Sequence, residues 1–177
     1  MRQDAPACPE PGAPRESFLL NNELTDFTIP PDPSSPHPNV AEPGKRLRSS
    51  MSPTIVLKDG EPALALGSPG GSTIITTVLQ ILVNHIDLGL PIDEVLSAPR
   101  LSQRNCGDGS TDAETAFLSA PEAEGLASLG HALSDAATLG GEIGAATALR
   151  FHGDGTVTAV AEPVRRHGGS AMVERPR

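Results

Sequence analysis

Two short apolar runs separated by an Asp-Gly pair place the strongest constraint on the fold of this chain. The runs are Thr54–Leu57 and Pro62–Gly67. Residues of these types favour strands, and Asp59-Gly60 is a dipeptide that suits a two-residue hairpin turn. Both runs are apolar at nearly every position, so we expect the hairpin to be buried on both faces. Such a hairpin needs a layer on each side, and the second layer need not come from this chain.

The sequence after this hairpin predicts helices and a second hairpin. Ser72 fits a helix N-cap, apolar residues recur at helical spacing from Ile74 to Ile86, and Gly89 stands where a helix ends. The pattern then predicts helices over 91–98 and 121–129, and a second hairpin with strands 146–151 and 156–161. We therefore expect an α+β fold, with one antiparallel sheet of about four strands and helices on at least one face.

The first 43 residues differ in composition from the rest of the chain. They hold ten of its 18 prolines. Proline removes a backbone donor and disfavours helix at the residue before it. We interpret 1–17 and 30–44 as irregular, with the island Ser17–Phe27 apolar enough to dock on another surface. The same composition is also consistent with a disordered tail over residues 1–44.

Charge and residue counts argue against several classes of protein. A formal net charge of -9 opposes the basic face that nucleic acid or anionic lipid requires. Cys8 and Cys106 are too few for a disulfide-built fold or a four-cysteine zinc site. The five histidines are scattered, so we predict no metal and no cofactor. No apolar run approaches the roughly 18 to 20 residues of a membrane span, and no signal peptide is visible.

A glycine-rich loop, Gly67-Ser68-Pro69-Gly70-Gly71-Ser72, connects a predicted strand to the long predicted helix. Paired glycines let backbone N–H groups turn toward one point, and a helix N-terminus adds positive partial charge. Such a loop can hold a phosphate or the oxyanion of acyl transfer. It is not a Walker loop, because no lysine follows the glycines. It can equally be a tight connection that binds nothing.

Two other segments carry groups suited to charged ligands. Ser49 and Ser50, just before the first strand, can donate hydrogen bonds to a carboxylate. Glu23 and Asp26 are three residues apart, so a turn would bring both carboxylates to one place, where they can hold an ammonium group. Either segment by itself is also compatible with an ordinary polar loop.

Taken together, these segments resemble the small subunit of γ-glutamyltransferases, also called γ-glutamyltranspeptidases or glutathione hydrolases. The resemblance is carried by NNELTDF, KRLRSSMSPTIVLKDG, GSPGGSTIITTVLQ and SAPR, in that order. It covers about residues 18–173, between an irregular Pro-rich segment 1–17 and a tail 174–177, and it weakens over 101–145. These enzymes are N-terminal nucleophile hydrolases. The resemblance therefore implies part of an αββα sandwich, with one antiparallel sheet and its helices.

The resemblance implies a role for each segment. Glu23 and Asp26 match the acids that hold the α-amino group of a γ-glutamyl moiety. The pair Ser49 and Ser50 matches the hydroxyls that bind its α-carboxylate, and Gly70 with Gly71 matches the glycines whose N–H groups form the oxyanion hole. These roles agree with the chemistry of the residues themselves. The implied substrate is a γ-glutamyl small molecule such as glutathione.

The nucleophile of the family has no counterpart among these residues. It is a threonine at the start of the small subunit, with its own α-amine as general base, and the 22 residues ahead of Glu23 contain no threonine. The large subunit, which supplies an arginine and the other half of the sandwich, is also absent. We therefore expect an inactive fragment of a protein that transfers or hydrolyses γ-glutamyl groups through a γ-glutamyl-Thr intermediate.

Two alternative functions stay open. One is a non-catalytic or split subunit that binds γ-glutamyl groups or pairs with a separate large subunit. The other is an amidase like the cephalosporin acylases, which share these motifs. Family members are often periplasmic or extracellular, so the resemblance leaves the compartment of this chain open.

Overall fold

The structure, a computed structural model, describes residues 22–30, 37–104 and 109–171. The chain divides into two compact units, Met1–Ser49 and Ser50–Arg177, and each is considered by itself. The predicted domain limits at 17/18 and 173/174 lie outside the described residues, as do both cysteines. Among the described residues of the first unit, the regular structure is one 3-10 helix, η1 (Glu23–Asp26).

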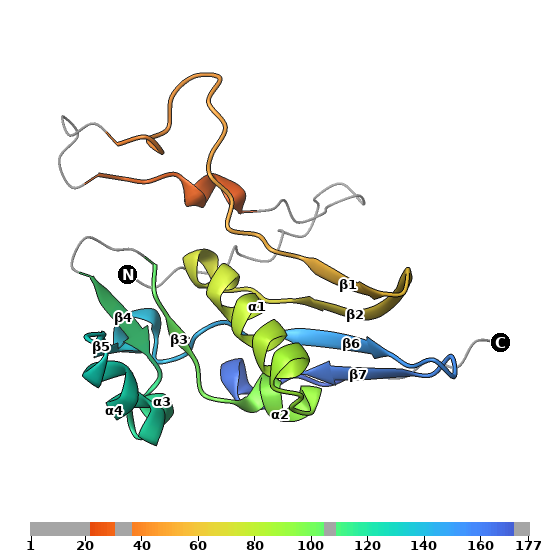
Figure 1. The fold of residues 1–177 in the computed structure, drawn as a ribbon. Helices are drawn as coiled ribbons and strands as arrows, with labels where there is room; N and C mark the ends of the chain where they lie inside the picture. Colours follow the sequence, from red (N-terminus) through yellow and green to blue (C-terminus); the bar gives the residue numbers. More distant parts are fainter. Residues whose placement is uncertain (1–21, 31–36, 105–108, 172–177) are drawn as a thin grey trace, which may run out of the picture. The chain divides into compact units, whose positions relative to one another are not determined.

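Two antiparallel hairpins form a four-stranded sheet in the second unit (Figure 1). The strands are β1 (Thr54–Lys58), β2 (Glu61–Gly67), β6 (Thr147–Phe151) and β7 (Val157–Ala161), in the order β1-β2-β6-β7. Both predicted hairpins are confirmed. The first turns at Asp59-Gly60, where both residues have positive φ angles of 54° and 87°. Asp and Gly tolerate this conformation, which the tight turn requires.

The residues after β2 form a continuous helical segment, as predicted, but its geometry changes along its length. It begins as a 3-10 turn, η2 (Gly71–Thr73), continues as α1 (Ile74–Leu82) and ends in a π-helical turn, η3 (Val83–Asp87). Ser72 lies inside η2 and does not cap α1, so the predicted N-cap is wrong. Gly89 has a φ of 71° just beyond the end, as expected for a glycine that terminates a helix.

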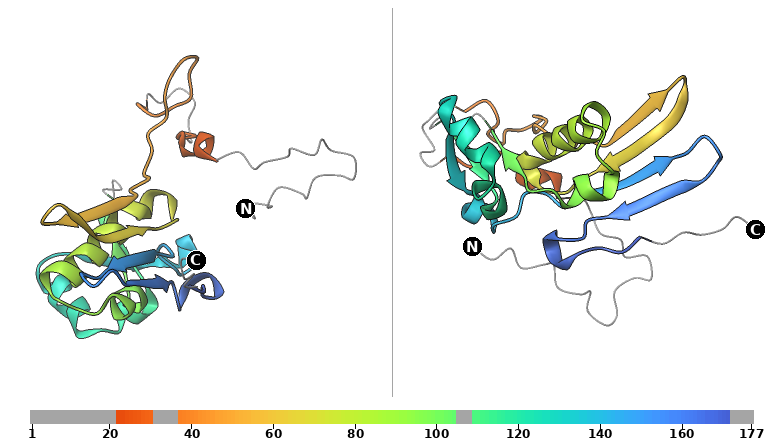
Figure 2. Two further views of the ribbon diagram at one scale, coloured as in Figure 1. Left: turned by 90° about the vertical axis from the view of Figure 1, so that its right-hand side faces the viewer. Right: turned by 60° about the horizontal axis from the view of Figure 1, so that its bottom comes forward.

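The core of the second unit lies between the sheet and two helices, α1 and α2 (Ile92–Ser97), which cover one face of the sheet (Figures 1 and 2). The helix predicted over 91–98 is thus confirmed. The buried core is aliphatic and comes from both hairpins and both helices: Leu64, Leu66, Val78, Ile81, Ile92, Val95, Leu96, Ala146 and Ala148. Three residues of the predicted apolar stripe are exposed, because a different face of the helix packs against the sheet: Ile75, Leu79 and Ile86.

The opposite face of the four-stranded sheet has no comparable layer of helices over it among the described residues. Ile55 and Leu57 on β1 are 68% and 60% exposed, and Leu149 and Val157 are also exposed. The prediction that the first hairpin is buried on both faces is therefore wrong for these residues by themselves. In the described part of the chain, the sheet has one apolar layer and lacks the second.

A second, three-stranded sheet was not predicted. Its strands are β3 (Leu101–Ser102), β4 (Ser110–Ala113) and β5 (Ala132–Asp135), with β3-β4 antiparallel and β4-β5 parallel. The chain passes from β4 to β5 through α3 (Thr115–Leu118) and α4 (Pro121–Ser128). α4 is the helix predicted over 121–129. These strands are short and β4 is polar, so they leave no periodic pattern in the sequence.

Two 3-10 turns complete the described elements: η4 (Ala136–Leu139) and η5 (Arg165–His167). None of the helices in the described ranges has both the length and the apolar character needed to cross a membrane. Of the predicted loop 107–110, Gly107 and Asp108 lie outside the described residues, whereas Ser110 begins β4.

Candidate functional site

The two predicted acids lie at the ends of the helical turn η1. Glu23 is its first residue and Asp26 its last, and both side chains are half-buried. Side chains three residues apart on a 3-10 helix lie above one another. The turn is closed by Thr25, whose N–H and hydroxyl both donate to the backbone oxygen of Asn22, at 3.0 and 2.8 Å. The local fold therefore supports the prediction that a turn brings the two carboxylates to the same side.

Asn39 connects this acid turn to the serine segment within the first unit. Its Nδ2 donates to the backbone oxygen of Asp26 at 2.7 Å, and its Oδ1 accepts from the backbone N–H of Arg48 at 2.9 Å. Arg48 directly precedes Ser49. The turn with the acids and the backbone leading to Ser49 thus belong to one hydrogen-bonded cluster. Sequence reasoning missed Asn39; its place beside Pro38 in a proline-rich loop, where asparagine often bonds nearby backbone, was the available signal.

Ser49 and Ser50 form the covalent joint between the two units. Ser49 is exposed and Ser50 is half-buried, and the Ser52 hydroxyl donates to the backbone oxygen of Ser50 at 3.2 Å. In the second unit, Thr54 at the start of β1 pairs with Leu66 at the end of β2. Ser50 and the glycine-rich loop therefore leave the same end of the first hairpin, which is how the fold brings these two sequence-distant segments toward one edge.

Two hydrogen bonds to the carbonyl oxygen of Gly70 fix the conformation of the glycine-rich loop. Thr73 donates to the oxygen of Gly70 through both its N–H and its hydroxyl, at 3.1 and 3.0 Å. Gly70 and Gly71 have φ angles of 145° and 54°, which favour glycine. Among the described residues, no protein acceptor takes the N–H of Gly70 or of Gly71. Two adjacent unpaired amide donors at the start of a helical segment are suited to an anion.

The wall behind this loop comes from the segment before β6. Ser68 accepts a hydrogen bond at its Oγ from the N–H of Ala145 at 3.0 Å. Gly144 packs against the loop so closely that a Cβ built on Gly70 would lie 3.3 Å from the Gly144 Cα. A Cβ on Gly144 would lie 2.7 Å from the Ser68 Oγ. Gly70 and Gly144 are in close contact here, and this contact fixes the direction of the Gly70 N–H.

Arg104 adds a positive charge beside the loop. Its guanidinium donates to Ser72 Oγ at 3.1 Å and forms an ion pair with Asp112 on β4. The contact joins the second sheet to the start of the helical segment. Sequence reasoning did not identify Arg104, because its two partners lie 32 positions before it and 8 positions after it.

A buried cluster of four charged side chains lies elsewhere in the second unit. Arg100 and Arg165 are each 2% exposed, and they contact Glu162 at 3.0 and 3.1 Å. Arg165 also donates to both carboxylate oxygens of Glu114, at 2.6 and 2.5 Å. Both arginines donate to the backbone oxygen of Leu96. The two positive and two negative charges balance, and the cluster ties helix and strand ends together.

Burial and pairing shift the pKa values in this cluster in opposite ways. Burial lowers the pKa of Arg100, and the neighbouring charge of Arg165 lowers it further. Burial alone would raise the pKa of Glu114, but the hydrogen bonds and charge of Arg165 outweigh it, so that pKa lies below its usual range. Burial also works against the charge of Arg165, yet its pairing with Glu114 leaves the pKa of Arg165 raised. Pairing therefore favours the charged forms of Glu114 and Arg165.

The histidines have structural partners. His85 contacts the backbone oxygen of Leu90 at 2.8 Å, and His152 contacts Thr158 Oγ1 at 2.8 Å. Within the described residues, no group of three histidine, cysteine or acidic side chains is arranged to hold a metal ion.

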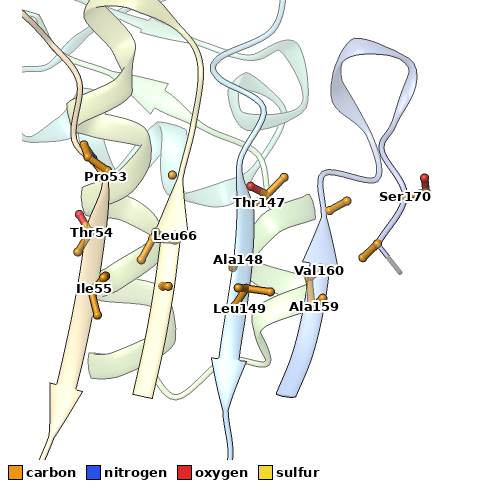
Figure 3. Close-up of a pocket in the computed structure, with 14 residues that line it drawn as sticks. Pro53, Thr54, Ile55, Leu66, Thr147, Ala148, Leu149, Ala159, Val160 and Ser170 are labelled. Atoms are coloured by element: carbon orange, nitrogen blue, oxygen red, sulfur yellow. The ribbon is translucent and has the colours of Figure 1, made fainter. Parts of the chain in front are cut away.

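A broad apolar hollow of about 690 Å³ lies on the uncovered face of the four-stranded sheet (Figure 3). Figure 3 looks onto this face, with the helices behind the strands, and shows Ile55 and Leu149 standing on it. Its lining comes from all four strands and is mostly aliphatic. A hollow of this shape and chemistry suits the packing of another apolar layer better than the binding of a charged small molecule.

Comparisons with known proteins agree on one family. A family model described as gamma-glutamyltranspeptidase matches residues 12–173. The chain is 36% identical over 166 residues to the glutathione hydrolase proenzyme of Pseudomonas aeruginosa, a match covering 90% of this chain and 29% of that protein. It is 34% identical over 167 residues to the acylase ACY 1 proenzyme of Pseudomonas sp. (strain SE83), covering 89% of this chain and 27% of that protein.

A solved structure shows the same fold. The γ-glutamyltranspeptidase from Pseudomonas nitroreducens, complexed with L-DON, matches with a TM-score of 0.73 and 34% identity. The match covers 93% of this chain and 84% of that chain. By contrast, the chain spans less than a third of the length of the two proenzymes.

Proposed function

The chain belongs to the γ-glutamyltranspeptidase family, and we propose that it supplies the head-group and oxyanion residues for transfer or hydrolysis of γ-glutamyl groups. The substrate class is γ-glutamyl amides such as glutathione. The intact protein forms a γ-glutamyl ester with a threonine and then passes the acyl group to an amine or to water. The fold supports this assignment, since the α+β prediction and the partial sandwich of N-terminal nucleophile hydrolases are confirmed.

The head group is held by charge complementarity. Glu23 and Asp26 accept hydrogen bonds from the α-ammonium group, and Ser49 and Ser50 donate to the α-carboxylate. Supporting this, Asn39 links the acid turn to the residue before Ser49. An ammonium held by two carboxylates and a carboxylate held by two hydroxyls together select an α-amino acid.

The Gly70 and Gly71 amides stabilise the negative charge on the carbonyl oxygen of the tetrahedral intermediate. The observation that carries this proposal is their pair of unpaired N–H groups at positive φ, at the same end of the hairpin as Ser50. Preorganised amide donors contribute about 3 to 4 kcal/mol to such transition states, because they need no reorganisation during the reaction. Arg104, which is ion-paired with Asp112, holds Ser72 beside these glycines.

The nucleophile comes from polypeptide outside these 177 residues, since no threonine precedes Glu23. The large subunit supplies the sheet with a second apolar layer, which packs on the exposed face around Ile55 and Leu149. The 177 residues alone therefore bind but do not turn over. A split subunit that pairs with a separate large chain fits the same observations, and a non-catalytic binding chain is the limiting case.

An acylase is a second candidate, favoured by the similarity to acylase ACY 1 over 89% of the chain. The two functions differ at the head group. A γ-glutamyl enzyme needs the acids of η1 for the α-ammonium, whereas an acylase acting on a plain dicarboxylic amide has no ammonium to hold.

Turnover of γ-glutamyl-p-nitroanilide tests the proposal. The chain is assayed alone, and again after it is extended at its N-terminus with the threonine-bearing start of a γ-glutamyltranspeptidase small subunit and assembled with the large subunit of that enzyme. Glutaryl-p-nitroanilide serves as the substrate that lacks the α-ammonium. We expect p-nitroaniline release only from the extended and assembled protein, and only with the γ-glutamyl substrate. Release by the chain alone would contradict the assignment of the nucleophile. Preference for the glutaryl substrate would favour the acylase.

A further inference from the structure

Asn39 is buried and hydrogen-bonded at both ends of its side-chain amide, although the proposed chemistry does not use it. It is 7% exposed. Its Nδ2 donates to the backbone oxygen of Asp26 at 2.7 Å and to Thr28 Oγ1 at 3.3 Å, and its Oδ1 accepts from the N–H of Arg48 at 2.9 Å. Its backbone adds two contacts: the oxygen accepts from Thr28 N–H at 2.9 Å, and the N–H donates to His37 Nδ1 at 3.2 Å.

These contacts join two stretches of backbone that have no other regular connection. Asp26 is the last residue of the acid turn, and Arg48 directly precedes Ser49. Between Asp26 and Thr54, the described residues form no helix or strand, so no ladder of backbone hydrogen bonds keeps the stretches in register. An asparagine amide has donors on one side and an acceptor on the other, and Asn39 turns one toward each stretch.

The geometry of an α-amino acid explains why the spacing between the two stretches of backbone is important. In an α-amino acid, the ammonium and carboxylate groups are bonded to the same carbon atom. The carboxylates and hydroxyls that hold them must therefore lie a fixed distance apart, and binding needs both at once. A misplacement of about 1 Å in such a site can lower the catalysed rate on the order of 100-fold.

We propose that Asn39 is a positioning residue that sets the spacing between the Glu23–Asp26 turn and Ser49, within the first unit. It does not touch the head group, and it acts through the two stretches of backbone that it links. The inference rests on the proposed function, because it assumes that the acids and the serines bind the same head group.

Binding of L-glutamate to the full chain, followed by NMR titration, tests this inference. L-Glutamate carries both charged groups, and glutarate serves as the probe without the α-ammonium. The main variant is Asn39→Leu, which is close in size and removes every side-chain hydrogen bond. A second variant, Asn39→Asp, keeps an acceptor for the Arg48 N–H but loses both donors. Asn84→Leu on η3 is the matched control, because it makes the same change in the other unit.

We expect wild type and Asn84→Leu to bind L-glutamate more tightly than glutarate. Asn39→Leu should weaken L-glutamate binding by about 10-fold or more, because the hydrogen bonds that keep the two charged contacts at the required spacing are lost. Its preference over glutarate should disappear, because each half of the site can still hold one group but not both. Asn39→Asp should lose this preference as well, and glutarate binding that is retained in both variants excludes simple unfolding as the cause.

The two hypotheses fail in different ways. If wild type does not distinguish L-glutamate from glutarate, the assignment of the head-group site is wrong, and the role of Asn39 is wrong with it. If wild type makes the distinction and both Asn39 variants retain it, the head-group site stands and the positioning role is wrong.

Discussion

At the scale of single residues, the two glycines of the loop are needed for different reasons. At Gly70 the obstacle is space, since a Cβ would lie 2.6 Å from Thr73 Oγ1 and 3.3 Å from the Gly144 Cα, and the φ of 145° adds strain. At Gly71 there is open space, and only the φ of 54° disfavours a side chain. The same substitution should therefore have unequal effects at neighbouring positions.

We predict that Gly70→Ala lowers the free energy of unfolding of the chain by about 2 kcal/mol or more, from strain and overpacking together. Gly71→Ala should cost about 1 kcal/mol, from the backbone conformation alone. Gly67→Ala is the control, because Gly67 has open space and no positive φ, and it should change stability by less than about 0.5 kcal/mol. Urea unfolding measures all three. Equal losses at Gly70 and Gly71 would contradict the packing against Gly144.

Ser49 and Ser50 make a prediction about binding rather than stability. In the chain extended with the small-subunit threonine and assembled with the large subunit, Ser49→Ala combined with Ser50→Ala should raise KM for γ-glutamyl-p-nitroanilide by about 10-fold or more, because donors to a charged carboxylate are lost. Ser97→Ala is a matched control, since the Ser97 hydroxyl bonds only backbone oxygens within α2 in the described structure. Steady-state kinetics of the variants test this, and an unchanged KM in the double variant would rule out the assignment.

At the scale of elements, the buried charges join the ends of helices and strands that secondary structure alone does not connect. Arg100 follows α2, Glu114 follows β4, and Glu162 and Arg165 follow β7. The cluster therefore joins the four-stranded sheet, a covering helix and the second sheet. Breaking one partner of such a pair leaves an uncompensated buried charge, which is far more costly than losing a surface ion pair.

We predict that Glu114→Gln lowers the free energy of unfolding at pH 7 by about 3 to 5 kcal/mol, because Arg165 loses the charge that compensates its burial. Glu122→Gln, on an exposed position of α4, is the control and should have little effect. Chemical denaturation at pH 7 measures both. A loss below about 1 kcal/mol in Glu114→Gln would show that the cluster is not coupled to folding.

The depressed pKa of Glu114 also predicts how stability depends on pH. A carboxyl group whose pKa is lower in the folded state stabilises the fold above its unfolded pKa, and this contribution is lost as pH falls through the folded value. Wild-type stability should therefore fall below about pH 4.3. The Glu114→Gln variant should show a shallower decrease over the same range, measured by unfolding at several pH values. An identical slope would mean that Glu114 does not contribute.

At the scale of the whole molecule, the sheet has one covered and one exposed face. Ile55 and Leu149 are exposed and line the hollow on the uncovered face. Apolar area of this kind marks a surface that another element covers. The proposed occupant is the large subunit, which would complete the sandwich.

We predict that Ile55→Lys changes the unfolding free energy of the chain alone by less than about 0.5 kcal/mol, because Ile55 is already exposed. The same variant should abolish assembly with the large subunit, because a buried charge in an apolar layer is costly. Val164→Lys is the control, since Val164 is 60% exposed and does not line the hollow. Co-purification and size-exclusion chromatography report assembly. Normal assembly by Ile55→Lys would place the partner on another surface.

The sequence by itself determined the features that neighbouring residues encode. Asp59-Gly60 identified the first hairpin, the apolar period after Ser72 identified the long helix, and the spaced motifs identified the family. Glu23 with Asp26 could be placed on one turn because their separation is local. Such features depend on turn chemistry and on side-chain periods, which operate over a few positions.

Only the tertiary structure decided which faces are buried and which charges meet. Residues 101–102 and 110–113 carry no strand pattern, yet they form β3 and β4, and contacts with α1 such as that of Gln80 with the Leu101 backbone hold β3 in place. The ion cluster pairs Arg100 with Glu162, 62 positions away. The side chain of Asn39 is bonded to Asp26 before it and to Arg48 after it. These outcomes depend on desolvation and on the meeting of distant groups, which no short stretch of sequence records.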